Sequence, residues 1–248
     1  MPCDWSNANG MPEGRSSVEK RAFMTVIRAA VDGDTRTVSR LLAADPALAI
    51  AQASGGATRQ NATEFYFDEI GHYLYAGDTA LHLAAAAFQR PIAELLVRRG
   101  ANCRARNRRG AEPLHYAADA NHWQPVAQKN VVEYLIEAGA DPNAFDNSGA
   151  AALHRAVRTR ASAAVQALLS GGARVDLRNA SGSTPLHLAV QDTGRGGSGS
   201  TRARREQEKI IAILLDAGAR AMDKDGNGRS VREAASNDRI RALLETRR

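Results

Sequence analysis

The sequence predicts an all-α repeat solenoid, a stack of similar helix pairs, and two observations predict it. A Leu-His-x-Ala motif occurs four times, beginning at Leu81, Leu114, Leu153 and Leu186. Each copy is followed by an apolar run at helical spacing that closes with Gly, at residues 92–101, 131–140, 164–173 and 210–219. Self-similarity at about 33 residues is typical of stacked helix-pair units. Such a stack offers a long recognition surface, which favours binding over catalysis.

Turn-rich segments separate the predicted helix pairs. Each has an Asn or Asp three residues before a Gly, at residues 107–110, 146–149, 179–182 and 225–228. An Asx residue in this position is typical of a tight turn. Ala pairs in the first helix of each unit would let neighbouring helices approach closely.

Each unit opens with four residues that end in Leu-His. They read Thr-Pro-Leu-His at residues 184–187 and differ from this at one or two positions at residues 79–82, 112–115 and 151–154. With these motifs, the chain resembles ankyrin-repeat proteins over roughly residues 20–245. The resemblance implies about six ankyrin repeats with short β-turn fingers, at roughly 20–50, 74–106, 107–145, 146–178, 179–224 and 225–245. The first and last units look like capping units, and the last has lost its His. The resemblance also implies that the four motif histidines hydrogen-bond the backbone and tie adjacent units together, rather than binding metal.

The spacing departs from this period at three insertions, near residues 51–73, 120–129 and 193–207. The first would make one elongated finger, and five of the ten Phe and Tyr residues lie within residues 50 to 76. Aromatic side chains often anchor binding sites, although these could equally pack the finger against the N-terminal unit. In the second insertion, Trp123 either contacts a binding partner or folds back over the ends of the helices. The third has linker composition and is predicted to be mobile.

The family resemblance implies that a partner binds the finger tips and the exposed side of the inner helices. The predicted partner-binding residues are Tyr66, Tyr73, Tyr75, Asp78, Arg108, Arg109, Asp119, Trp123, Asn147, Arg158, Ser181, Gln191 and Asp192. In chain order, this predicted binding surface begins with aromatic residues, becomes basic at Arg108 and Arg109, and ends with polar residues. A protein or extended peptide with a carboxylate and an apolar anchor would complement it.

The predicted function is a protein-protein interaction scaffold without catalysis. The alternative is a small-molecule or enzymatic site between the long finger and the groove. Its candidate catalytic residues are Asp68, Glu69, His72 and Tyr73, which could transfer protons. No nucleophile elbow, phosphate loop or dinucleotide fingerprint supports it. Nucleic-acid binding is not favoured, because the chain has no recognition-helix motif and no alternating aromatic and basic platform.

Composition narrows the class of protein further. The 248 residues carry a net charge of +6 and are 44% hydrophobic but only 5% aromatic. The sequence has no apolar run long enough to span a membrane and no signal-peptide pattern at its start. The two cysteines give neither zinc spacing nor a disulfide framework. We therefore expect a cytoplasmic monomer with no cofactor, no metal and no membrane contact, and a flexible tail over residues 1–19.

Overall fold

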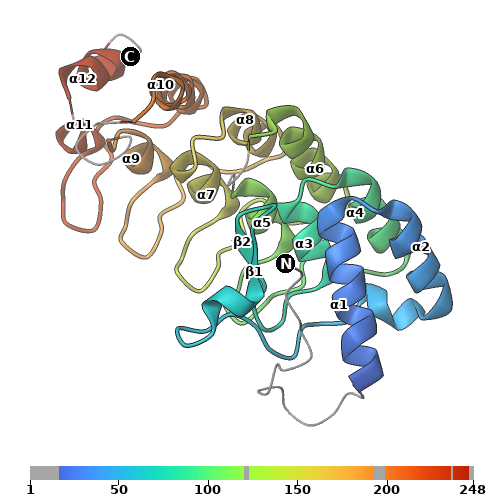
Figure 1. The fold of residues 1–248 in the computed structure, drawn as a ribbon. Helices are drawn as coiled ribbons and strands as arrows, with labels where there is room; N and C mark the ends of the chain where they lie inside the picture. The colour runs from blue at the N-terminus through green and yellow to red at the C-terminus, as the bar shows by residue number, and fades with distance from the viewer. Residues whose placement is uncertain (1–16, 120–122, 193–198, 236, 246–248) are drawn as a thin grey trace.

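The computed structural model describes residues 17–119, 123–192, 199–235 and 237–245, which form a helical repeat arrangement. Helices pair in chain order and the pairs lie side by side, with the connecting turns gathered at one edge (Figure 1). The first helices of the pairs are α1 (Ser17–Asp32), α3 (Ala80–Ala86), α5 (Pro113–Ala118), α7 (Ala152–Arg158), α9 (Pro185–Ala189) and α11 (Val231–Ala234). The second helices are α2 (Thr35–Ala44), α4 (Arg90–Arg98), α6 (Pro125–Glu137), α8 (Ser162–Ser170), α10 (Thr201–Asp216) and α12 (Asp238–Glu245).

The core runs between adjacent pairs, and small residues set its spacing. Helix α3 packs against α1, α4 and α5, and α7 packs against α5, α8 and α9. Ala84, Ala117 and Ala156 are fully buried in α3, α5 and α7, so these neighbouring helices can approach closely. Helices α4, α6, α8 and α10 are each followed by a Gly in the left-handed region, as at Gly100 with φ 93°, a conformation that Gly adopts without steric cost.

The predicted Asx turns are present and stack on one another. In each, Oδ1 accepts the backbone N–H groups two and four residues later, at Asn107, Asp146, Asn179 and Asp225. Neighbouring turns are joined by backbone hydrogen bonds, including Arg108 N to Ala76 O at 2.8 Å and Asn147 N to Arg109 O at 2.9 Å. Side chains that project from these turns are therefore held at a fixed spacing.

The four motif histidines hydrogen-bond the backbone of two units, which confirms their predicted structural role. In each, Nδ1 accepts the N–H of the residue three positions earlier, at 3.1 to 3.3 Å. Nε2 donates to a carbonyl of the next turn, from His82 to Ala111, His115 to Ala150, His154 to Ser183 and His187 to Arg229. A carbonyl only accepts, so Nε2 carries the proton and the ring is neutral. Glu233 replaces the His in the last pair, and its carboxylate accepts the N–H of Ser230 at 2.7 Å.

These buried histidines are expected to make the fold sensitive to acid. Burial lowers the pKa of the four motif histidines and of His72, in His115 to about 4. An unfolded His has a pKa of about 6.5, so the unfolded chain binds more protons below that pH. The free energy of unfolding therefore keeps the full contribution of these neutral rings above about pH 6.5. It decreases from there towards pH 4, by up to about 1.4 kcal/mol per pH unit for each histidine. We expect Tm, measured by circular dichroism, to fall steeply from pH 7 to pH 5. A Tm that stays constant over this range would contradict the assignment of neutral buried rings.

Two of the predicted insertions contribute helix rather than loop. Residues 125–129 lie in α6 and residues 201–207 lie in α10, so the prediction that the third insertion is mobile is wrong for its helical part. Ser200 caps α10, because its Oγ accepts the N–H of Ala203 at 3.2 Å. Gln128 Nε2 donates to Ala117 O at 2.9 Å and Gln207 Nε2 donates to Ala189 O at 2.8 Å, which fixes both helix starts on the preceding helix.

Parts of three predictions lie outside the described residues. These are residues 120–122 of the second insertion, 193–198 of the third and 1–16 of the predicted flexible tail. Residues 17–19, also predicted as tail, belong to α1.

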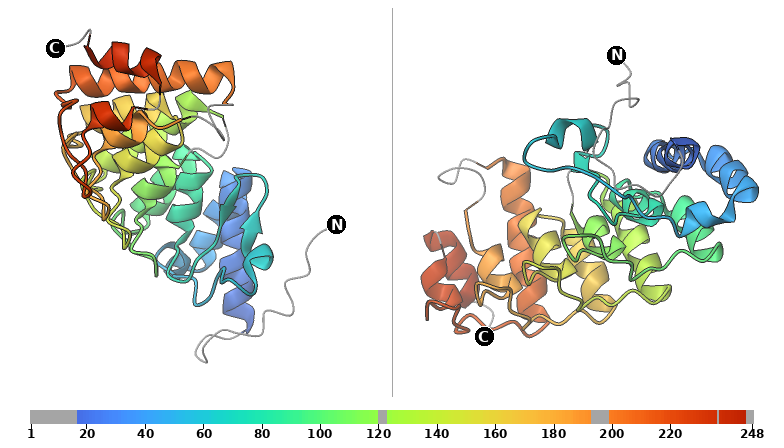
Figure 2. Two further views of the ribbon diagram at one scale, coloured as in Figure 1. Left: turned by 90° about the vertical axis from the view of Figure 1, so that its left-hand side faces the viewer. Right: turned by 90° about the horizontal axis from the view of Figure 1, so that it is seen from below.

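The segment between α2 and α3 contains a short hairpin beside α1 (Figure 2). It includes 3₁₀ turns at Pro46–Ala49 and Ala62–Phe65 and the antiparallel strands β1 (Tyr66–Phe67) and β2 (His72–Tyr73). Its aromatic residues lie in two groups. Phe65 and Phe67 are buried, and the guanidinium of Arg28 in α1 lies 5.7 Å from the Phe67 ring. The three tyrosines instead form a row, with ring centroids 4.7 Å apart for Tyr66 and Tyr73 and 6.2 Å apart for Tyr73 and Tyr75.

Candidate binding site

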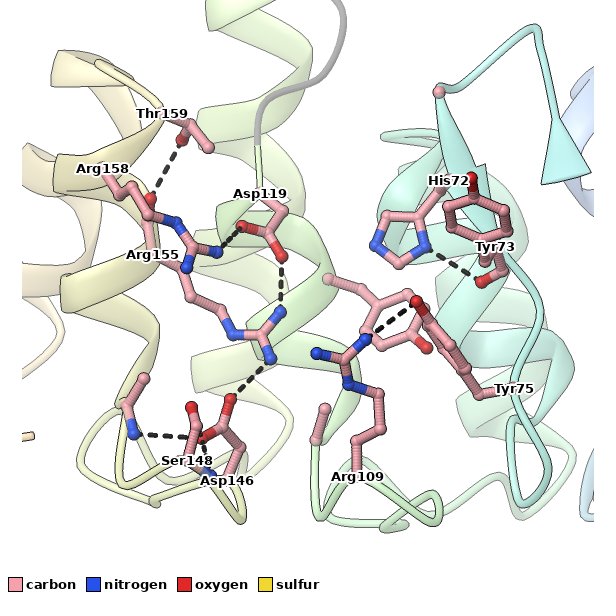
Figure 3. A pocket seen from close by; sticks show the side chains of 14 residues that line it. His72, Tyr73, Tyr75, Arg109, Asp119, Asp146, Ser148, Arg155, Arg158 and Thr159 are labelled. Atoms are coloured by element: carbon pink, nitrogen blue, oxygen red, sulfur yellow. Dashed lines mark hydrogen bonds and ion pairs between the residues drawn. The ribbon is translucent and has the colours of Figure 1, made fainter. Parts of the chain in front are cut away.

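A pocket of about 340 Å³ lies where the β1–β2 hairpin faces the ends of α5 and α7 (Figure 3). This volume is near the lower end of the range for small-ligand sites, about 300–1,000 Å³. Three consecutive parts of the chain line it. They contribute Gly71, His72, Tyr73 and Tyr75 from the hairpin, then Arg109, Ala111, Tyr116 and Asp119, then Asp146, Ser148, Ala150, Arg155, Arg158 and Thr159.

Arg155 forms a buried ion triad at one side of the pocket. Its two terminal nitrogens donate to Asp119 at 2.5 Å and to Asp146 at 2.6 Å, and all three side chains are at most 11% exposed. Burial raises the pKa of Asp146, but hydrogen bonds from Ser148, Arg155 and the Ala150 N–H outweigh it and lower that pKa to about 2. Both carboxylates are thus committed to Arg155, whose Nε has no hydrogen-bond partner within the described part of the chain.

Arg109 and Tyr75 form the opposite side of the pocket. Arg109 Nη1 donates to Tyr75 Oη at 2.8 Å, and its guanidinium carbon lies 4.8 Å from the centre of the same ring. Arg109 makes no ion pair with a described carboxylate, and Figure 3 shows its free end directed into the pocket. Arg108 lies 5.4 Å from the Tyr75 ring and donates to Ala57 O, so it fastens the hairpin segment to the next turn.

His72 lies between the hairpin and α5 and is only 9% exposed. Its Nδ1 donates to Tyr73 O at 3.0 Å, and its ring lies 4.3 Å from the Tyr116 ring. Since Nδ1 carries the proton in this bond, Nε2 of the neutral ring is an acceptor. Figure 3 shows that this nitrogen is turned toward the pocket.

Asp78 is fully buried, so the prediction that it contacts a partner is wrong. Its carboxylate accepts hydrogen bonds from Tyr75 N at 2.6 Å, Asn107 Nδ2 at 2.8 Å and Tyr116 Oη at 2.8 and 2.9 Å. Burial is the largest cause that raises the pKa of Tyr116 well above its usual value. Asp78 therefore stabilises the floor beneath the hairpin rather than forming part of its surface.

The other predicted residues divide between the pocket and the surface around it. Tyr73, Tyr75, Arg109, Asp119 and Arg158 line the pocket. Tyr66, Arg108, Trp123, Asn147, Ser181, Gln191 and Asp192 do not line it, although all are exposed. The guanidinium of Arg202 in α10 lies 4.5 Å from the Trp123 ring, so Trp123 of the third helix pair contacts the fifth pair. Of the proposed catalytic set, His72 and Tyr73 line the pocket whereas Asp68 and Glu69 are exposed outside it.

Several lining residues were not predicted, among them Tyr116, Asp146 and Arg155. A sequence signal existed for Arg155, because it occupies the variable position of the Leu-His-x-Ala motif, where two other copies have Leu83 and Leu188. A charge in a position that is otherwise apolar or aromatic needs a buried partner. Asp146 gave no such signal, because its turn role alone explains an Asx residue there.

Paired helices, stacked Asx turns and repeated histidine ties define the chain as a helical repeat protein. A family model described as Ankyrin repeats (3 copies) matches residues 23–146 and 126–225, so the chain belongs to the ankyrin-repeat family. Ankyrin repeats are generally protein-protein interaction modules. A comparison with curated proteins found no match. Within the described residues, no helix is both long and apolar enough to cross a membrane.

Proposed function

We propose that this chain is a binding module that holds an extended segment of a partner protein across its turns and first helices. In this proposal the fold has about six ankyrin repeats, and one elongated finger lies within residues 50–76. The observation that carries the proposal is the pocket in Figure 3, where the hairpin and two successive units converge. Ankyrin family membership supports binding of a protein rather than catalysis.

Charge and exposure at the pocket favour a partner segment that carries acidic groups. Arg109 has no ion pair with a described carboxylate, and Arg158, which is 65% exposed, lies 3.5 Å from Asp119 at its nearest nitrogen. Guanidinium groups with free donors favour carboxylates. Tyr66 and Tyr73 beside them offer rigid aromatic surface to an apolar anchor of the same segment.

Further exposed residues extend the proposed surface from the pocket toward the later units. Asn147 and Ser181 lie on the next turns, and Gln191 and Asp192 follow α9. An extended peptide covers about 3.3 Å per residue, so a short segment would contact several units. Trp123 lies outside the pocket and is proposed as a contact at its margin. We also propose that the protein is a cytoplasmic monomer.

Selection from a library of random 12-residue peptides displayed on phage tests this function. We expect enrichment of sequences that combine Asp or Glu with an aromatic or aliphatic residue. A selected peptide should lose roughly tenfold or more in affinity for Arg109→Gln, because a charge-assisted hydrogen bond is lost. The affinity is measured by fluorescence anisotropy of the labelled peptide.

A matched control is Arg174→Gln. Arg174 is an exposed arginine paired with Asp176 at 2.9 Å, and it does not line the pocket. This variant should bind the selected peptide as the unchanged protein does. Equal losses in both variants, or failure of the library to enrich any sequence, would contradict the proposed surface.

The small-molecule or enzymatic alternative receives less support from this geometry. His72 and Tyr73 reach the pocket, but Asp68 and Glu69 are exposed on the turn between β1 and β2. The carboxylates that do reach it, Asp119 and Asp146, are both engaged by Arg155. Proton transfer needs a base free to accept a proton, and His72 is the one lining residue with an acceptor nitrogen open to the pocket.

A further inference from the structure

We infer that the pocket receives one carboxylate of the bound segment, from an Asp or Glu side chain that binds beside Arg109, and that His72 takes up a proton when it does. This inference rests on the proposed function and gives it a specific anchor. It also gives binding a dependence on pH. Three features support it, namely the net charge of the pocket lining, the position of the Arg109 guanidinium and the orientation of the His72 ring.

The charged side chains that line the pocket sum to +1. Arg109, Arg155 and Arg158 are positive, Asp119 and Asp146 are negative, and His72 is neutral. One bound carboxylate brings this sum to zero while His72 is neutral, and the proton that His72 then takes up returns it to +1. An Asp or Glu side chain is the anion that a protein segment itself carries, so the proposed function favours a carboxylate over a phosphate.

Arg109 and Arg158 supply positive charge on two sides of the same pocket, and Nη2 of Arg158 lies 3.5 Å from Asp119 Oδ1. Arg109 is held in place by Tyr75, through its hydrogen bond and by lying 4.8 Å from the ring centre, which lowers the entropy lost on binding. Arg158 lies on the opposite side, beyond the Arg155 triad (Figure 3). Both terminal nitrogens of Arg155 already donate to carboxylates, to Asp119 and to Asp146, so its charge is balanced within the triad.

His72 is the titratable group that a carboxylate in this pocket would meet. Its Nε2 is an unprotonated acceptor turned toward the pocket. A neutral ring presents a lone pair to the incoming carboxylate, which is repulsive, whereas a protonated ring donates a hydrogen bond to it. Bound carboxylate therefore favours the charged form of His72.

The surroundings of His72 hold it neutral until then. Burial is the main cause that lowers its pKa, and Arg155 lowers it further. Asp119, Asp78 and the Tyr73 carbonyl raise it, while Tyr116 packs against the ring and His82 lies on the helix behind. A new anion at Nε2 would raise the pKa of His72 further. By linkage, affinity for the carboxylate must rise as the pH falls, by at most about tenfold per pH unit for one proton.

The test uses capped aspartate, N-acetyl-aspartate N-methylamide, with capped asparagine as its uncharged match. Nitrogen-15 NMR of the imidazoles follows each histidine from pH 5.5 to pH 8. With saturating capped aspartate, we expect the pKa of His72 to rise by at least about half a unit, while His115 stays unchanged as an internal reference. Capped asparagine should leave His72 unchanged. The affinity of capped aspartate should increase as the pH falls, and this slope should be lost in His72→Gln.

Each outcome has a defined meaning. An unchanged His72, an affinity that is constant or decreases on acidification, or tighter binding of inorganic phosphate would overturn the inference. Arg109→Gln provides a second readout, with a roughly tenfold weaker affinity for capped aspartate. If library peptides bind but capped aspartate leaves His72 unchanged, the inference fails and the proposed function stands. If capped aspartate behaves as expected but no peptide is enriched, the proposed function fails instead.

Discussion

Asp78→Ala is expected to lower the free energy of unfolding by about 3 kcal/mol, although Asp78 lies in no helix core. The carboxylate is fully buried and accepts from Tyr75 N, Asn107 Nδ2 and Tyr116 Oη. Its removal leaves at least two buried donors without their charged acceptor, and each such group costs about 1–3 kcal/mol. Urea unfolding followed by circular dichroism measures the loss.

Tyr116→Phe is the matched variant for Asp78→Ala. It removes one donor but leaves the carboxylate with the Tyr75 and Asn107 donors, so we expect a smaller loss of about 1.5 kcal/mol. The double variant should lose less than the sum of the two single variants, because the residues share one hydrogen-bond network. A loss below about 1 kcal/mol for Asp78→Ala, or strict additivity in the cycle, would show that this network contributes little to stability.

The regular part of the fold could be predicted because local chemistry repeats with it. The Asx-to-Gly spacing at Asn107 and Asp146 specifies turns that form as predicted. The Leu-His motif likewise leads to the histidine bonds, because His154 and its counterparts meet the same carbonyl in the next unit. Periodicity carries this information because each unit packs chiefly on its neighbours.

The site could be predicted only where its residues stand at turn or hairpin positions. Tyr75 and Arg109 were predicted from their places in the chain, and they do meet. Asp78 was misplaced for a physical reason, because the position after the turn Gly holds Ala111 and Ala150 in the next units and gave no sign of a buried carboxylate. Its acceptor role depends on Tyr116, which is distant in sequence. Long-range pairing of buried polar groups is not encoded in a local pattern.

The start of α10 could not be predicted from local composition either. Residues 201–207 have the composition of a linker, yet they begin α10 because Glu206 and Gln207 are buried against the preceding units. Ser162 Oγ donates to Glu206 Oε2, and Gln207 Nε2 reaches Ala189 O. Tertiary contacts of this kind override local propensity.

The largest loss of stability is expected for Arg155→Ala, about 3–5 kcal/mol. Arg155 neutralises Asp119 and Asp146, whose side chains are 11% and 3% exposed. Without the guanidinium, two buried carboxylates face each other with no cation between them, which costs more than the ion pairs themselves contribute. Thermal and urea unfolding of the variant at pH 7 measure this loss.

The pH dependence of this loss separates charge from packing. In Arg155→Ala the pKa of Asp146 rises, because its cation is gone while its burial remains. A carboxylate whose folded pKa is raised destabilises above its unfolded pKa, and protonation relieves this cost as the pH falls. The deficit relative to the unchanged protein should therefore shrink from pH 7 to pH 5, even though the histidines weaken both proteins over that range.

The double variant Arg155→Met/Asp119→Asn keeps most of the side-chain volume and removes one of the two carboxylate charges, so it should recover part of the loss. A deficit that is independent of pH, with no recovery in the double variant, would assign the role of Arg155 to packing of its alkyl chain alone.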